Sequence, residues 1–66
     1  KLELMDVLKE MQKLAPQMRE VIYLRVMGQL SFKEIGEIVG RSENWARVTF
    51  YRGKEQLLIK RKEWDH

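Results

Sequence analysis

The chain has 66 residues and a mass of 8.0 kDa, with 35% charged residues, 44% hydrophobic residues and a net charge of +3. This length supports one small hydrophobic core and excludes a second domain or a deep substrate cleft. The sequence has no cysteine and a single histidine, His66, which excludes a disulfide framework, a thiolate metal site and a histidine relay. No segment has the apolar length of a membrane span or the form of a signal peptide.

We therefore expect a soluble intracellular module that is not an enzyme and needs no cofactor. Residues 1–66 are expected to form a single domain, and because the chain begins with Lys1 rather than Met we expect it to be a piece of a longer protein. It has no nucleophile–base pair, metal cluster or phosphate loop from which a catalytic site could be built.

Basic side chains are concentrated in the last third of the sequence. Residues 1–40 are balanced in charge, whereas residues 41–62 carry seven basic and two acidic side chains. A basic segment on an otherwise balanced chain is typical of a surface that binds a polyanion. The same composition also fits an ordinary solvated helix, so charge alone leaves both interpretations open.

Apolar positions recur at helical spacing and predict an all-α fold of four helices. Residues 2–14 have an amphipathic pattern. Residues 16–27 begin with a proline, which suits a first helical position, and are apolar around most of the helix surface. We expect this second helix to be nearly enclosed by its neighbours and to stop at Gly28. The methionines are expected to fill gaps in the core, namely Met5, Met11, Met18 and Met27.

The last two predicted helices are separated by a tight turn. Ser31 and Glu34 have the spacing of a capping box, and Gly40 ends this short helix. Ser42 is a second N-cap candidate, from which the helical pattern continues through the basic segment. Two helices joined by a short glycine-containing turn, the second of them basic, are typical of a helix-turn-helix, here over about residues 31–62.

The second helix of this motif has two chemically distinct faces when residues are placed at about 100° intervals. One face is small or apolar and is expected to pack on the domain; it comprises Ala46, Thr49, Phe50, Gly53 and Leu57. The opposite face comprises Asn44, Arg47, Val48, Tyr51 and Arg52. Arginine reads guanine, asparagine reads adenine and apolar atoms contact the thymine methyl group in the major groove. This face predicts DNA binding, although the plain alternative is that it is only solvated. The small residues Gly36, Ala46 and Gly53 would let the paired helices approach closely.

Three segments, in the right order and spacing, resemble region 4 of bacterial sigma factors, and most closely the extracytoplasmic-function (ECF) group. Residues 14–21 (LAPQMREV) are similar to the opening of that region. Residues 30–36 (LSFKEIG) are similar to the first helix of its helix-turn-helix, and residues 42–54 (SENWARVTFYRGK) to its recognition helix.

The resemblance implies a cytoplasmic bacterial protein that docks on the β flap of RNA polymerase and places its last helix in the major groove of the −35 promoter element. It also implies that an anti-sigma factor is a partner of this region. By position in the motif, the residues that face bases are Asn44, Arg47, Val48, Tyr51 and Arg52. Phosphate contacts are expected from Arg41, Ser42, Trp45, Lys54, Lys60 and Arg61. No catalytic or metal-binding residue is implied.

Four positions depart from the family pattern. The position that usually holds the turn glycine is occupied by Gln29, and the glycine of this chain, Gly28, stands one residue earlier. Gly36 replaces a typical alanine, at a cost of up to about 1 kcal/mol in helix propensity. Arg41 stands at a usually apolar turn position, and Trp45 replaces a small hydroxyl residue. The bulk of Trp45 means that the family's contact there is not repeated unchanged.

Two other interpretations remain open at this level. The motif could be the helix-turn-helix of a response regulator or a site-specific recombinase, which usually act as dimers on paired half-sites. It could instead be an interaction module held by an anti-sigma factor or a polymerase subunit. Charge reversal at Arg47 and Arg52 would leave such protein binding largely intact if it used the first two helices.

Overall fold

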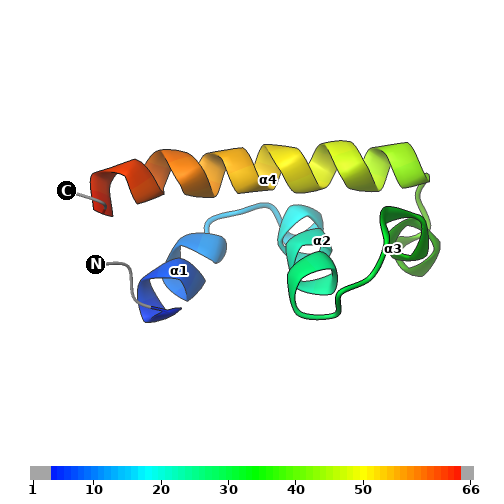
Figure 1. Ribbon diagram of the computed structural model, residues 1–66, viewed down its shortest axis with the longest axis horizontal. Helices are drawn as coiled ribbons and strands as arrows, with labels where there is room; N and C mark the ends of the chain where they lie inside the picture. The colour runs from blue at the N-terminus through cyan, green and yellow to red at the C-terminus, as the bar shows by residue number, and fades with distance from the viewer. Residues whose placement is uncertain (1–3, 65–66) are drawn as a thin grey trace.

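The computed structural model describes the backbone of residues 4–64 and the side chains of residues 5, 6 and 8–57. These residues form four helices, and the described part of the chain contains no strand: α1 (Leu4–Met11), α2 (Pro16–Val26), α3 (Phe32–Val39) and α4 (Glu43–Trp64). The molecule measures 38 × 17 × 17 Å. Helix α4 runs along its length, and α1, α2 and α3 lie in chain order along one side of α4 (Figure 1). The predicted all-α fold with four helices is confirmed.

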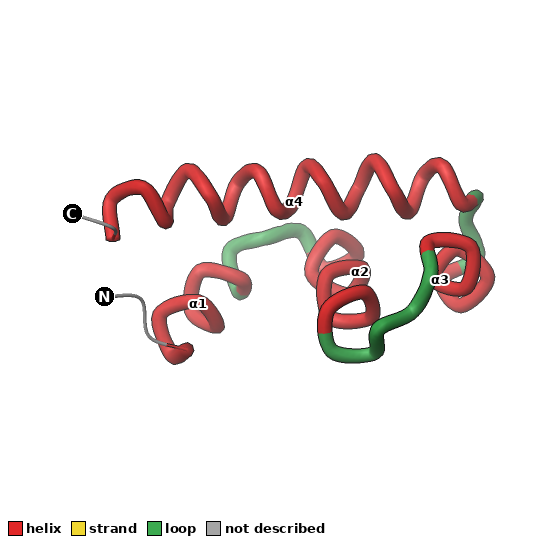
Figure 2. The backbone as a smooth tube through the Cα atoms, viewed as in Figure 1, coloured by secondary structure: helices red, strands yellow, loops and turns green. Residues whose placement is uncertain are grey.

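The first helix is shorter than the sequence pattern predicted. It ends at Met11 rather than at residue 14, and a turn follows in which Leu14 N–H donates to the Met11 carbonyl at 3.1 Å (Figure 2). Proline disfavours helical backbone at the preceding residue, and Ala15 is accordingly extended, with ψ of 144°. Residues 12–15 connect α1 to α2, and the Leu14 side chain is buried although it lies outside both helices. Residues 2 and 3 lie outside the described part.

The core consists of two clusters of buried side chains that meet along α4. The first joins the end of α1, the following loop and α2 through Met11, Leu14 and Ile22. The second joins α2, α3 and α4 through Val21, Ile35 and Ala46, all of which have no exposed surface. Phe50 packs against both clusters. The helix-turn-helix pair is therefore seated on α2 by close-packed apolar contacts.

Helix α2 is more exposed than the sequence predicted. Val26 is 59% exposed and Met27, the residue that caps the helix, is 67% exposed. The expectation of an enclosed helix was wrong because the three other helices of so short a chain are too few to surround α2. The methionine prediction holds for Met11, which is 5% exposed, and Met18 is half-buried. It fails for Met27 and for Met5, which is 64% exposed.

Two neighbouring residues shape the turn after α2: one has left-handed backbone, and the other allows a close approach of the chain. Gln29, and not Gly28, has the left-handed backbone, with φ of 55°. Gly28 is needed for close approach instead, because a Cβ atom there would lie 2.7 Å from the Leu24 carbonyl oxygen. The helix itself already ends at Val26. The left-handed position thus coincides with the position of the family's turn glycine.

The capping box predicted at the start of α3 is confirmed. The Ser31 hydroxyl accepts a hydrogen bond from the Glu34 N–H at 3.1 Å, and the Glu34 carboxylate accepts one from the Ser31 N–H at 2.8 Å. Hydrogen bonding of the Glu34 carboxylate by the Ser31 N–H, and to a smaller extent by the Ser31 hydroxyl, favours its ionised form and holds the pKa of Glu34 below its ordinary value of 4.5. At the other end, Gly40 caps the helix in the left-handed conformation with φ of 75°.

This pKa shift predicts a pH dependence of stability. Because the pKa of Glu34 is lower in the folded than in the unfolded chain, its stabilisation is fully present above the unfolded value and is lost as the pH falls through the folded value. Glu34→Gln keeps a capping side chain that does not titrate. We expect the melting temperature, followed by circular dichroism, to fall more in the wild type than in Glu34→Gln between about pH 6 and about pH 3. Equal falls in the two proteins would show that the capping box does not depend on the charge.

Candidate nucleic-acid interface

The turn between α3 and α4 is packed directly against α3. A Cβ atom on Gly36 would lie 2.6 Å from the Arg41 carbonyl oxygen and 3.0 Å from the Ser42 carbonyl carbon, so only glycine leaves room for the turn. At the start of α4 the Ser42 hydroxyl accepts a hydrogen bond from the Trp45 N–H at 3.0 Å, which confirms the predicted N-cap. The close approach expected at Gly36 is also confirmed.

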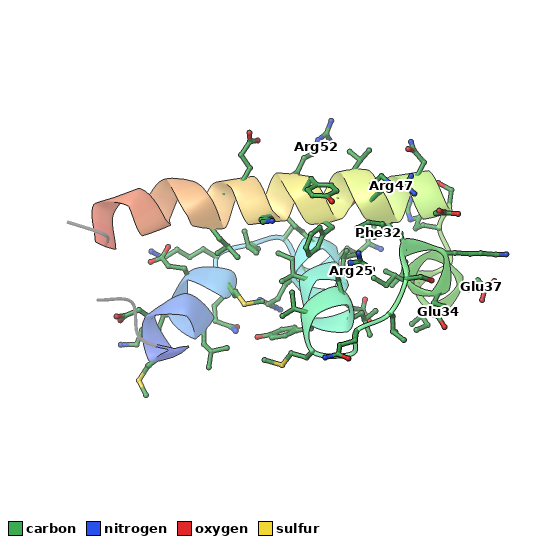
Figure 3. All side chains as sticks on the ribbon, viewed as in Figure 1. Arg25, Phe32, Glu34, Glu37, Arg47 and Arg52 are labelled. Carbon is green, nitrogen blue, oxygen red and sulfur yellow. The ribbon has the colours of Figure 1, made fainter. Side chains whose placement is uncertain are left out.

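The two faces predicted for α4 are present. On the packed face Ala46 and Gly53 are buried, and the remaining members, Thr49, Phe50 and Leu57, are half-buried. On the opposite face every predicted residue is exposed; this surface, called the base-contact face below, comprises Asn44, Arg47, Val48, Tyr51 and Arg52. Figure 3 shows Arg52 directed away from the other three helices. The helix thus presents its polar groups to solvent along one side.

Arg47 is held by two neighbours. Its Nη2 donates to the Glu43 carboxylate oxygen Oε2 at 2.9 Å, and its guanidinium carbon lies 5.4 Å from the centre of the Phe32 ring. The same ring lies 4.3 Å from the guanidinium carbon of Arg25, whose Nη1 donates to the Leu30 carbonyl at 2.8 Å (Figure 3). Cation–π contacts of this kind orient a guanidinium on the ring face. Phe32 therefore links α2 to the base-contact face.

An aromatic group supports the middle of the same face. The Tyr51 ring lies 5.2 Å from the Phe50 ring and 6.0 Å from the Phe32 ring, both in tilted or edge-on geometries that aromatic pairs prefer. Tyr51 nevertheless stays 53% exposed. The two aromatic neighbours hold the ring on the core, and the Lys54 ammonium lies 6.0 Å from its centre.

The residues expected to contact phosphate are divided between two places. Arg41, Ser42 and Trp45 gather at the start of α4, where the guanidinium carbon of Arg41 lies 5.1 Å from the centre of the Trp45 ring. Trp45 is half-buried and packs on the cluster of Val21, Ile35 and Ala46, so only part of its ring faces outward. Lys54 lies about three turns further along α4. The side chains of the other two, Lys60 and Arg61, lie outside the described residues.

Sequence reasoning missed two residues that shape this surface. Arg25 was given no role, although its guanidinium stacks on Phe32 beside Arg47, and Glu43 was given none, although it pairs with Arg47. The spacing of Glu43 and Arg47, four residues apart on one helix, is a signal for such a pair. For Arg25 no comparable local signal exists, because its neighbours come from other helices.

The geometry defines a class of protein. A helix-turn-helix with a capped, basic second helix, one face buried and the other exposing guanidinium, amide and phenol groups, is a DNA-binding module. Anionic ligands are further favoured at the start of α4 by the positive end of the helix dipole. Within the described residues no helix is long and apolar enough to cross a membrane, and no group of acidic or histidine side chains is arranged to hold a metal ion.

Comparison with known families agrees with this class. The family described as Sigma-70, region 4 matches residues 4–57, and the chain belongs to that family. It is a region of sigma factors that binds promoter DNA at the −35 element and acts together with RNA polymerase; it is a DNA-binding module and not an enzyme family. Neither a curated protein nor a solved structure gives a significant match to the chain.

Proposed function

We propose that this chain is the −35-reading region of an extracytoplasmic-function sigma factor, and that the base-contact face of α4 reads the promoter sequence. The observation that carries the proposal is the exposure of all five predicted base readers while the opposite face of the same helix is packed on the core. Arg47 and Arg52 are suited to guanine, and Asn44 to adenine. Val48 and Tyr51 offer apolar atoms to a thymine methyl group. The assignment to the ECF group rests on the resemblance of the three segments described above.

Phosphate contacts would supply most of the affinity. The candidates are Arg41, Ser42, Trp45, Lys54, Lys60 and Arg61. About four or five such contacts correspond to a slope of about −4 when log K is plotted against log salt concentration. The isolated domain is therefore expected to bind weakly at physiological salt, and the rest of the sigma factor would add the contacts to the −10 element.

Selection of the 66-residue chain on a randomised duplex library at low salt tests this proposal. The expected result is an asymmetric enriched motif of about 5–7 base pairs, the length that one recognition helix reads in a major groove. A symmetric motif bound by a dimer would favour a response regulator or a recombinase. No enrichment, with binding that disappears as salt rises, would leave only non-specific attraction to phosphate.

A second surface is suited to hold RNA polymerase. An apolar groove of about 240 Å³ opens between α1, α2 and α4, and its lining includes Leu8, Ile22, Val26, Met27 and Leu57. Leu57 belongs to the packed face of α4, so an occupant of the groove would leave the base-contact face free. We propose that the groove receives the β flap of RNA polymerase. The exposure of Val26 and Met27 and the family's known action with the polymerase support this assignment.

Val26→Glu should weaken binding of the β flap by the groove without changing DNA binding by the base-contact face. A carboxylate in an apolar interface must lose its water, so we expect binding to the isolated flap to weaken about tenfold or more, which is about 1.4 kcal/mol. Because Val26 is already exposed, folding and the selected DNA motif should not change. Arg47→Ala should change the selected DNA motif and leave binding to the isolated flap unchanged.

An anti-sigma factor is the second candidate for this groove, favoured by the exposed Met27 in its lining. If the chain were only a protein-binding module, Val26→Glu would still disrupt protein binding but the wild type would select no DNA motif. Unchanged flap binding by Val26→Glu would place the polymerase contact elsewhere.

A further inference from the structure

An acidic side chain borders the base-contact face at the first residue of α4. The carboxylate of Glu43 accepts a hydrogen bond from Arg47 at 2.9 Å, and the two side chains are 50% and 44% exposed. An exposed pair of this kind contributes only about 0.3–0.5 kcal/mol to stability. A carboxylate on a surface that approaches phosphates also lowers non-specific affinity. Its place in the first turn of α4 adds a favourable interaction with the helix dipole, and both stabilising effects are small.

We propose that Glu43 is a specificity-determining residue that aims Arg47 at a base and reads a neighbouring base pair with its own carboxylate. This inference rests on the function proposed above. It adds to the base-contact face an acidic reader, a kind of group that the predicted set of readers lacks.

The first part of the inference concerns the orientation of Arg47. A guanidinium has five N–H donors in one plane, and the bond to Glu43 occupies only one side of it. Phe32, 5.4 Å away, borders the same group. The remaining donors suffice for a bidentate contact with guanine O6 and N7. The adjacent negative charge disfavours the approach of a phosphate oxygen, so the pair directs Arg47 to a base edge rather than to the backbone.

The second part concerns the free carboxylate oxygen of Glu43. An ionised carboxylate only accepts hydrogen bonds, so it matches the amino groups of cytosine and adenine and repels guanine O6 and thymine O4. One helical turn separates Glu43 from Arg47, about 6 Å along the axis, which is less than two base-pair steps of about 3.4 Å. The selected motif should therefore contain a cytosine or adenine within two positions of the guanine read by Arg47.

Two variants with the same change in net charge test this inference. Glu43→Gln keeps the shape of the side chain but removes the charge and adds N–H donors. Glu37→Gln removes an equal charge from α3, where Figure 3 shows Glu37 on the side away from the base-contact face. Glu43→Ala serves as a second variant without any polar group. The wild type and all three variants are run in the same duplex selection, and dissociation constants are then measured by fluorescence anisotropy on the best site and its single-base variants.

The expected result is that both Glu43 variants lose about fivefold or more of the discrimination at the amino-base position, which corresponds to about 1 kcal/mol. Their preference for the neighbouring guanine should also weaken, while binding to random duplex rises. Glu37→Gln should keep the wild-type motif. If the Glu43 variants keep the wild-type motif and only bind every duplex more tightly, Glu43 acts as a charge alone and the inference is overturned. A wild-type selection without any motif would overturn the proposed function itself, and a melting curve shows that each variant is folded.

Discussion

Replacing Arg47 with alanine is expected to cost about 1–3 kcal/mol of binding free energy on the selected site and to abolish the preference for guanine at one position. The reason is geometric, because Arg47 is exposed on the base-contact face and is oriented by Glu43 and Phe32. Loss of a base-reading arginine changes which sequence is bound, whereas loss of a phosphate contact weakens all sequences alike. Parallel selections with wild-type and variant chains measure the difference directly.

Arg19→Ala is the matched control for this experiment. It removes the same charge from α2, where the Arg19 guanidinium lies 3.4 Å from the carbonyl and side-chain oxygens of Gln12. We expect it to keep the wild-type motif with at most a small uniform loss of affinity. If Arg47→Ala lost affinity equally on every duplex, Arg47 would be a phosphate contact, and the reading of the promoter would have to come from Tyr51 and Arg52.

Gly36→Ala is expected to destabilise the domain although alanine is the better helix former. The added Cβ would lie 2.6 Å from the Arg41 carbonyl oxygen, and this backbone cannot move without disturbing the Ser42 cap. Overpacking costs about 1–3 kcal/mol, and a backbone clash belongs at the upper end of that range. Against a gain of about 1 kcal/mol in helix propensity, the net loss should be about 1–2 kcal/mol. Thermal unfolding would show this as a melting temperature lower by about 4 °C or more.

Gly53→Ala is expected to be milder than Gly36→Ala, because the atoms that the added Cβ would meet belong to side chains and not to the backbone. There the added Cβ would lie 2.7 Å from Ile22 Cδ1 and from Met18 Cγ, which are parts of side chains that can rotate. Their adjustment should roughly offset the gain in propensity, so we expect a change in stability within about 1 kcal/mol. If Gly36→Ala proved as mild as Gly53→Ala, the turn between α3 and α4 would not be packed as closely as the structure shows.

The parts of the fold that local chemistry determines were predictable from the sequence. The capping box of Ser31 and Glu34 marked the start of α3, and Gly40 marked its end. The separation of α4 into a packed and an exposed face followed from helical spacing alone, because a helix places its side chains at fixed angles. The end of α1 at Met11 had no such signal, because Pro16 restricts only the residue before it and was already compatible with an end at residue 14.

Features that depend on contacts between helices were not predictable in this way. The apolar surface of α2 indicated burial, but periodicity does not tell how many neighbours a helix has, and Val26 and Met27 proved to be exposed. The stacking of Arg25 and Arg47 on Phe32 joins three helices through space. No spacing within one segment encodes such a contact. The left-handed conformation of Gln29 likewise runs against its residue type.

The closely packed turn before α4 helps to fix the direction in which this long helix runs. Arg52 lies about 14 Å along the helix axis from Glu43, so a tilt of about 5° at the turn would displace its backbone by about 1 Å. A displacement of that size is enough to break a hydrogen bond to a base. Asn44, close to the turn, would barely move. We therefore expect Gly36 and Ser42, together with the packed face of α4, to set the angle at which the distant end of the base-contact face would meet DNA.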